Sequence, residues 1–269
     1  MTSQASISAG LKQLHGAARA WLGSWWRLLH FAVLIWSVAL SPATYSRANR
    51  PLLARQLVLS TAPNLMWFTV LSALVSLVLI RIVVVTAISY GLTRYALEMV
   101  VRVLVLELLP LTVALFVALR ITLPDGIEFA QLRARGALET LRRQGIDLLR
   151  REFFPRVAAG VFATWMLAAV SCVLSLLLAY LSIYGFTPWA LQGYTRVVGQ
   201  VFNPAVTLIL VLKIVFFSFA AALIPMASSY YDPAVQGERP RTAHGLSDML
   251  RLFSVILVIE VASLMGNYY

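Results

Sequence analysis

Long apolar blocks separated by short polar stretches dominate the sequence. Five blocks stand out, at residues 65–87, 100–121, 157–180, 205–228 and 250–265. A helix needs about 20 apolar residues to cross about 30 Å of hydrocarbon, and all but the last of these blocks reach that length. Within lipid the backbone must satisfy its own hydrogen bonds, and the sequence has no series of alternating strands of about ten residues. We therefore predict an all-α polytopic membrane protein with about five transmembrane helices.

The first 50 residues have a different pattern, in which tryptophan alternates with basic residues. The uncharged run in this segment, residues 31–40, is only about half as long as a span requires. Tryptophan prefers the headgroup level, which favours an amphipathic helix lying in the membrane interface. The alternative is a sixth span over residues 21–40, which would leave the orientation of the other five unchanged and would export the first twenty residues. We assign residues 1–50 to this N-terminal segment and residues 51–269 to a transmembrane domain.

The most polar internal stretch covers residues 124–156 and holds seven arginines against five acidic residues. It must lie in water or at the interface. With five spans it falls on the same side as the N-terminal segment and the loop at 232–248. The opposite side receives Arg94, Arg196 and an uncharged tail. Because cytoplasmic loops hold the excess of arginine and lysine, we predict a cytoplasmic N-terminus and a periplasmic C-terminus.

Composition and charge agree with a membrane protein. Hydrophobic residues make up 60% of the chain and charged residues 12%, and the mean hydropathy is +0.82. The net charge of +11 would suggest nucleic acid as the partner of a soluble protein. Here basic loops that orient the chain and face anionic lipid explain the charge, so we expect membrane lipids and no nucleic acid as partners. Cys172 is the single cysteine and cannot form an intramolecular disulfide.

Ionisable residues within or beside the apolar blocks are the first candidates for function, because they are costly in lipid. Four such residues are Glu107, Arg120, Lys213 and Glu260. For Glu107, Lys213 and Glu260 we favour pairing between helices over direct contact with a substrate. Glu98 and Arg102 stand four residues apart, as expected of an ion pair on one helix. The three histidines are too scattered to predict a metal site.

Residues 107–156 read ELLPLTVALFVALRITLPDGIEFAQLRARGALETLRRQGIDLLRREFFPR. This stretch resembles the permease family of MCE-associated ABC transporters, the MlaE or YrbE type. The family pattern is aligned without a gap at Glu107, Pro110, Arg120, Glu128, Leu141, Gly145, Ile146, Asp147, Arg150, Pro155 and Arg156. Weaker similarity extends from about residue 51 to the C-terminus.

The chain departs from this family pattern at several positions. Leu106, Leu109 and Leu148 replace an arginine, a glycine and a proline of the pattern. The acidic signature, which usually has two carboxylates, is reduced to a single Glu139 within residues 136–140. The sequence therefore resembles a divergent member of the family.

The resemblance implies a permease subunit, without catalysis of its own, that moves phospholipid or another hydrophobic substrate between the inner membrane and an MCE-protein assembly. It implies four partners: an ABC ATPase, an MCE-domain protein expected to be hexameric, a second copy or a paralogous permease, and membrane lipids. The sequence has no G-x-x-x-x-G-K-[ST] loop, so we expect ATP and Mg on the partner ATPase and no cofactor in this chain. The residues expected to couple to that ATPase are Glu139, Arg142, Gly145, Ile146, Asp147 and Arg150.

Simpler interpretations of the same residues remain open at this point. In the simpler interpretation, the arginines between residues 142 and 151 are headgroup anchors and nothing more, and Asp147 is an ordinary helix N-cap. The degenerate acidic signature also leaves open a non-transporting scaffold or assembly subunit. A membrane-embedded enzyme that modifies lipids would need a cluster of catalytic groups, and the few acids and histidines do not suggest one.

Overall fold

A computed structural model describes residues 23–47, 49–92, 95–143, 147–231 and 241–268. Within these ranges the chain forms helices and no strand, so the predicted all-α class is confirmed. Six helical stretches are long and apolar enough to cross a membrane, judged by length and composition alone. All five predicted spans lie within these stretches.

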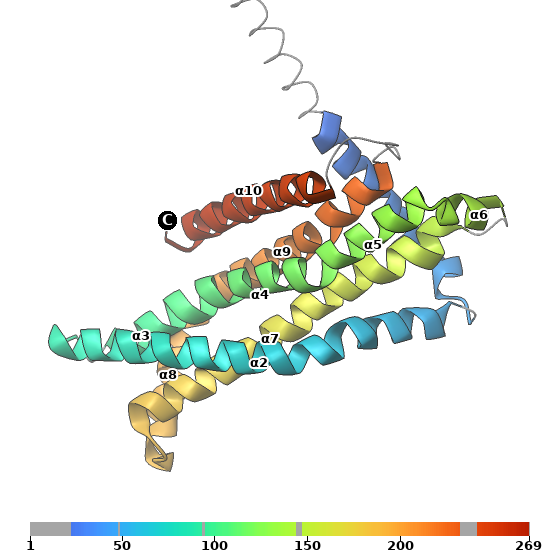
Figure 1. Cartoon of the computed structure of the whole chain (residues 1–269). Coiled ribbons are helices and arrows are strands. Elements are labelled where there is room, and N and C mark those ends of the chain that lie inside the picture. The colour runs from blue at the N-terminus through green and yellow to red at the C-terminus, as the bar shows by residue number, and fades with distance from the viewer. Residues whose placement is uncertain (1–22, 48, 93–94, 144–146, 232–240, 269) are drawn as a thin grey trace, which may run out of the picture.

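The helices follow one another along the chain with few breaks (Figure 1). After the helix Gly23–Leu40 and η1 (Pro42–Tyr45) come α2 (Arg50–Ser89), α3 (Ala96–Val100), η3 (Val101–Leu108), α4 (Leu109–Val117), η4 (Ala118–Thr122) and α5 (Leu123–Ala134). Next are α6 (Ala137–Arg143), η5 (Leu149–Phe153), α7 (Phe154–Tyr184), η6 (Pro188–Ala190), α8 (Leu191–Val201), α9 (Pro204–Tyr231) and α10 (Arg241–Tyr268). The stretch from α3 to α5 is continuous, and η3 and η4 within it are π-helical.

The spanning helices are longer than the apolar blocks that predicted them. Helix α2 has 40 residues and is about 60 Å long, roughly twice the hydrocarbon thickness. It begins with Pro51 in its first turn, where a missing N–H costs nothing. It ends at Ser89, and Gly91 just beyond has a φ of 70°, which allows the Leu92 N–H to bond the Ala87 carbonyl at 2.7 Å. Local end signals therefore set the length of α2, independently of where its apolar block stops.

Small side chains allow α2 and α7 to pack closely. Ser72 and Ser76 on α2 and Ser171 and Ser175 on α7 are buried. The Ser76 and Ser175 hydroxyls hydrogen-bond each other at 2.6 Å. Small residues of this kind let helix backbones approach in a membrane, where burial of apolar surface provides no driving force.

The two ends of the bundle differ in their elements. One end of the bundle, which we term the α6 end, holds α6 together with the start of α2, the end of α5, the start of α7, the end of α9 and the start of α10 (Figure 1). The α2–α3 connection, α8 and the C-terminus lie at the other, the α8 end. Five spans of alternating direction predict this grouping, which also puts the arginine-rich stretch at the α6 end.

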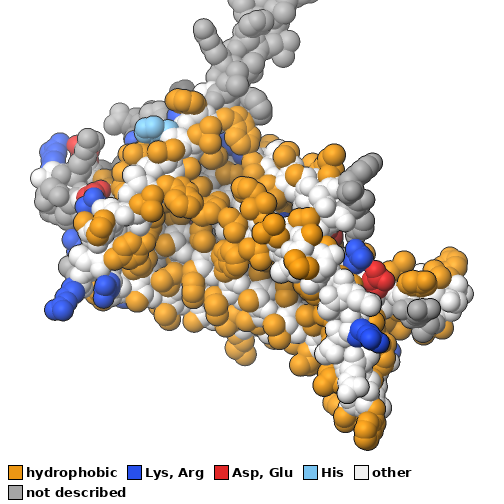
Figure 2. Space-filling view, turned by 180° about the vertical axis from the view of Figure 1, so that it is seen from behind, with side chains coloured by type: hydrophobic (Ala, Val, Ile, Leu, Met, Phe, Trp, Pro, Cys, Tyr) orange, Lys and Arg blue, Asp and Glu red, His pale blue; other side chains and the backbone are white. Residues whose placement is uncertain are grey.

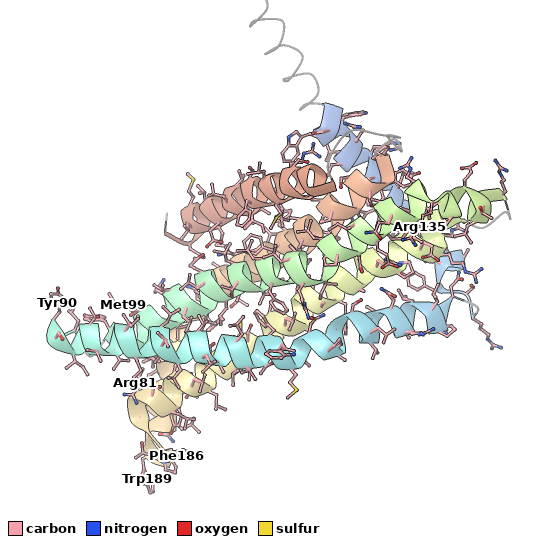
Figure 3. All side chains as sticks on the ribbon, in the orientation of Figure 1. Arg81, Tyr90, Met99, Arg135, Phe186 and Trp189 are labelled. Carbon is pink, nitrogen blue, oxygen red and sulfur yellow. The ribbon has the colours of Figure 1, made fainter. Side chains whose placement is uncertain are left out.

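Side chains follow the same division. Phe186 and Trp189, before α8, are 91% and 94% exposed, and with Tyr90 they lie at the opposite end from Arg135 (Figure 3). Across the middle of one face the side chains are mainly hydrophobic, and most charged side chains lie towards its ends (Figure 2). This distribution fits a band of lipid around the middle of the bundle.

The helix Gly23–Leu40 is the sixth candidate span and the least apolar of the six. Its ring contacts are with η5 and the second half of α9. Phe31 contacts Phe153 and Tyr230, His30 contacts Tyr231, and Trp36 contacts Phe219. These contacts place it beside the α6 end of the bundle (Figure 1). Contacts with the bundle fit both a spanning and an interfacial helix, so the interfacial position that the sequence favours stays a prediction.

Candidate functional site

The polar segment at the α6 end is built from α5, α6 and η5. Helix α5 continues directly from the second long span, so it is an extension of a membrane helix. Gly136 follows it with a φ of 72°, a conformation that side chains other than glycine rarely adopt, and α6 begins at the next residue. The turn that redirects the chain is therefore at Gly136.

The predicted coupling residues are distributed over this segment, and the structure describes only some of them. Glu139 is exposed in the first turn of α6. Arg142 belongs to α6, and Gly145 and Ile146 lie outside the described residues. The coupling role of Gly145 and Ile146 therefore stays a prediction.

Asp147 and Arg150 form a local pair at the start of η5. Asp147 Oδ1 accepts the N–H of Leu149 at 3.1 Å, and Asp147 Oδ2 lies 3.4 Å from Arg150 Nε. The N-cap of η5 is Leu148, so Asp147 precedes the cap position instead of occupying it. Arg150 Nη2 also donates to Ser41 Oγ at 3.4 Å, which ties η5 to the end of the Gly23–Leu40 helix.

Arg156, in the first turn of α7, connects α7 to α5. Its guanidinium donates to both carboxylate oxygens of Glu128, at 3.1 and 3.4 Å, and lies 3.9 Å from Asp125 Oδ1. The same group lies 4.4 Å from the ring centroid of Phe129. Phe129 stacks on Phe153 with centroids 4.3 Å apart. Glu128 and Arg156 both match the family pattern, whereas no sequence pattern singled out Asp125.

Arg133, in the last turn of α5, reaches α9. Its Nη1 donates to the carbonyls of Ser229 and Tyr230 at 3.2 and 2.5 Å. The last carbonyls of a helix have no partner within the helix and carry a partial negative charge, so an arginine is well matched to them. Sequence reasoning missed this role, because nothing near Arg133 in the chain indicates that α9 ends beside it.

A buried ionic cluster lies within the membrane part of the bundle. Lys213 on α9, whose side chain is 1% exposed, pairs with Glu107 on η3 and lies 2.9 Å from Glu260 Oε2 on α10. Asn267 Nδ2 donates to Glu107 Oε1 at 3.1 Å. Three of the four predicted intramembrane polar residues are thus brought together. Arg120, the fourth, is exposed on η4, apart from the cluster.

A backbone carbonyl completes the coordination of Lys213. The Leu106 carbonyl accepts from Lys213 Nζ at 3.3 Å. The ammonium therefore faces two carboxylates and one carbonyl, which together use its three donors. The arrangement holds η3, α9 and α10 together through charge.

These features define a class of protein: a polytopic α-helical membrane protein with its polar segment at one end and one ionic cluster in its interior. Among the described residues there is no group of three or more His, Cys, Asp or Glu side chains that could hold a metal ion. A family model described as Permease MlaE matches residues 53–265. The chain belongs to this permease family, and it is a transmembrane permease of an ABC transporter. A comparison with curated proteins gives no match.

Proposed function

We propose that this chain is the permease subunit of an ABC transporter that moves phospholipid or a similar hydrophobic substrate between the inner membrane and an MCE-protein assembly. A separate ATPase subunit supplies the energy and holds ATP and Mg. The permease works as a pair, formed with a second copy or with a paralogous permease. The observation that carries this proposal is the family match over residues 53–265, which covers both the membrane helices and the polar segment.

The α6 end supports a site for the ATPase. Helix α5 belongs to the second long span and η5 runs directly into α7, so a force applied to α6 or η5 reaches the spans directly. Glu139 is exposed there, and Asp147 and Arg150 are half-buried or exposed, so they are accessible to a partner. Under this proposal the α6 end is cytoplasmic and the C-terminus is periplasmic, in agreement with the excess of arginine at the α6 end.

Exposed apolar surface supports a hydrophobic substrate and a paired permease. Helix α10 packs mainly on α9, and large side chains such as Phe253, Leu257 and Val261 remain exposed along it. Lipid or a second permease can cover this surface, and a lipid cavity between two subunits would be lined mostly by apolar side chains. The proposal places the transported lipid in such a cavity.

The test is reconstitution of the permease with its ATPase and MCE-domain partners in proteoliposomes. We expect ATP-dependent transfer of labelled phospholipid by the complex, and no ATP hydrolysis above background by this chain alone. A complex that assembles and hydrolyses ATP without moving lipid would overturn the proposal and indicate a scaffold. Mass spectrometry of the lipid gives a second outcome, because a chemically altered lipid would indicate an enzyme.

A further inference from the structure

Helix α5 is joined to α9 at its N-cap. Thr122 is the N-cap residue of α5, and its hydroxyl donates to the carbonyl of Ala221 on α9 at 2.6 Å. Pro225, four residues further along α9, has no N–H with which to bond that carbonyl. In a membrane helix a carbonyl freed in this way needs a partner from a neighbouring side chain. Thr122 supplies it.

The backbones of α5 and α9 then stay close for the next turn. A Cβ added to Gly126 on α5 would lie 3.0 Å from the Pro225 carbonyl oxygen, so a larger side chain would force the helices apart. Helix α7 meets both at the same level. A Cβ at Gly160 would lie 2.8 Å from Thr122 Cγ2 and 3.2 Å from Ala222 Cβ. The three helices therefore have almost no room to slide at this junction.

Arg133 joins α5 to α9 again, at the last turn of both helices. Its two hydrogen bonds reach carbonyls that the end of α9 cannot satisfy internally. A guanidinium shared between two carbonyls resists both rotation and withdrawal of α5, since either movement leaves polar groups unpaired. Helix α5 is thus fixed to α9 from its first turn to its last, through Thr122, Gly126 and Arg133.

Helix α9 also carries Lys213 of the ionic cluster. Lys213 precedes Ala221 by eight residues on one uninterrupted helix, a separation of about 12 Å along its axis. A displacement of α9 at the α6 end therefore changes the position of Lys213 relative to Glu107 and Glu260, which lie on other helices.

We infer that Arg133 is a positioning residue, which fixes the polar segment to the end of α9 so that ATP-driven movement of α6 displaces α9 and Lys213 with it. This inference rests on the proposed function, because it assumes that the ATPase moves α6. Arg133 touches neither substrate nor nucleotide in this scheme. It determines how much of each ATP-driven movement reaches the interior of the bundle.

The first test compares Arg133→Gln with Arg133→Lys in the complete transporter. We expect the Gln variant to retain its ATPase and hydrolyse ATP, while the lipid moved per ATP falls on the order of tenfold, as for the loss of hydrogen bonds to a charged group. Lys keeps the charge and can donate to both carbonyls, so it should restore most of the ratio. Arg55→Gln is the matched control, because Arg55 is an exposed arginine near the start of α2, at the same end of the bundle as Arg133.

The second test follows movement, with spin labels at exposed positions: Thr140 on α6, Phe216 on α9 and Val58 on α2. In the wild-type complex ATP should change the α9–α2 distance and leave the α6–α9 distance nearly constant. In Arg133→Gln the α6–α9 distance should change and the α9–α2 change should shrink. Thr122→Val, which loses one hydroxyl, is measured as well in case the Arg133 variant fails to fold.

The two tests separate the inference from the proposed function. Wild-type complex that shows the distance changes but moves no lipid would refute lipid transport and leave the role of Arg133 standing. Unchanged lipid moved per ATP in both Arg133→Gln and Thr122→Val would overturn the inference while the proposed function holds. Equal α6–α9 distances with and without ATP in Arg133→Gln would overturn it too.

Discussion

At the scale of single residues, the ionic cluster shows how this chain places charge inside a membrane. An isolated ammonium in an apolar medium is very unfavourable, and burial requires both ion pairing and hydrogen bonds. Lys213 has two carboxylates and the Leu106 carbonyl within reach, and Asn267 donates to Glu107. Removal of Lys213 leaves two carboxylates in the interior without a cation, so the cluster is expected to behave as a unit.

Replacement of Lys213 by Met should therefore destabilise the fold by about 3–5 kcal/mol, the cost of breaking a buried pair. Combining it with Glu107→Gln and Glu260→Gln should recover most of that loss, because no uncompensated charge then remains. The measurement is thermal unfolding in detergent. Arg120→Met is the control, since Arg120 is exposed and apart from the cluster, and it should cost little. Equal losses in the single and triple variants would refute the unit behaviour.

At the scale of elements, the turn between α5 and α6 depends on one backbone conformation. Gly136 has a φ of 72°, and a Cβ there would meet nothing within 4 Å. A substitution therefore acts through backbone strain and not through a clash. Because Glu139 is exposed on α6, a change of direction at Gly136 moves that surface while leaving the spanning helices intact.

We expect Gly136→Val to release the ATPase during purification while membrane insertion stays normal. A β-branched residue at a positive φ costs on the order of 1–2 kcal/mol or shifts the turn. Gly193→Val is the control, because Gly193 on α8 has an ordinary φ and open space around it. ATPase retained in full by Gly136→Val would show that the direction of α6 does not matter for docking.

At the scale of the whole molecule, the ends of the helices decide the topology. The structure groups the arginine-rich stretch, the start of α2 and the end of α9 at one end, and the C-terminus at the other (Figure 1). This grouping holds whichever side of the membrane each end faces. The excess of arginine at the α6 end predicts a cytoplasmic position for that end.

Reporters fused to the chain test that orientation. A reporter after Tyr269 should be external and one inserted after Gly237 should be cytoplasmic. A third reporter at the N-terminus tests the Gly23–Leu40 helix, because an interfacial helix keeps that terminus cytoplasmic whereas a sixth span exports it. If the reporter inserted after Gly237 is external, the orientation is the opposite of the predicted one, and the proposed position of the ATPase is wrong.

The sequence by itself determined the membrane class, the five predicted spans and the Glu98–Arg102 pair, in which Arg102 Nε lies 3.0 Å from Glu98 Oε1. Each of these follows from neighbouring residues, because the free energy of transfer into lipid is a sum over the residues of one segment, and a spacing of four residues is a property of one helix. Helix lengths were underestimated, since capping and turn residues beyond the apolar blocks decide where helices end.

Only the tertiary structure decided which distant groups meet. Lys213 and Glu107 are separated by 106 residues, and Arg133 and Ser229 by 96. Nothing along the chain indicates that Arg133 ends beside α9 or that Thr122 bonds the Ala221 carbonyl. Such contacts depend on how whole helices cross and shift against one another, and those positions result from the packing of many side chains at once. A local pattern shows that a carbonyl before a proline needs a donor, but only the packed bundle determines which residue provides it.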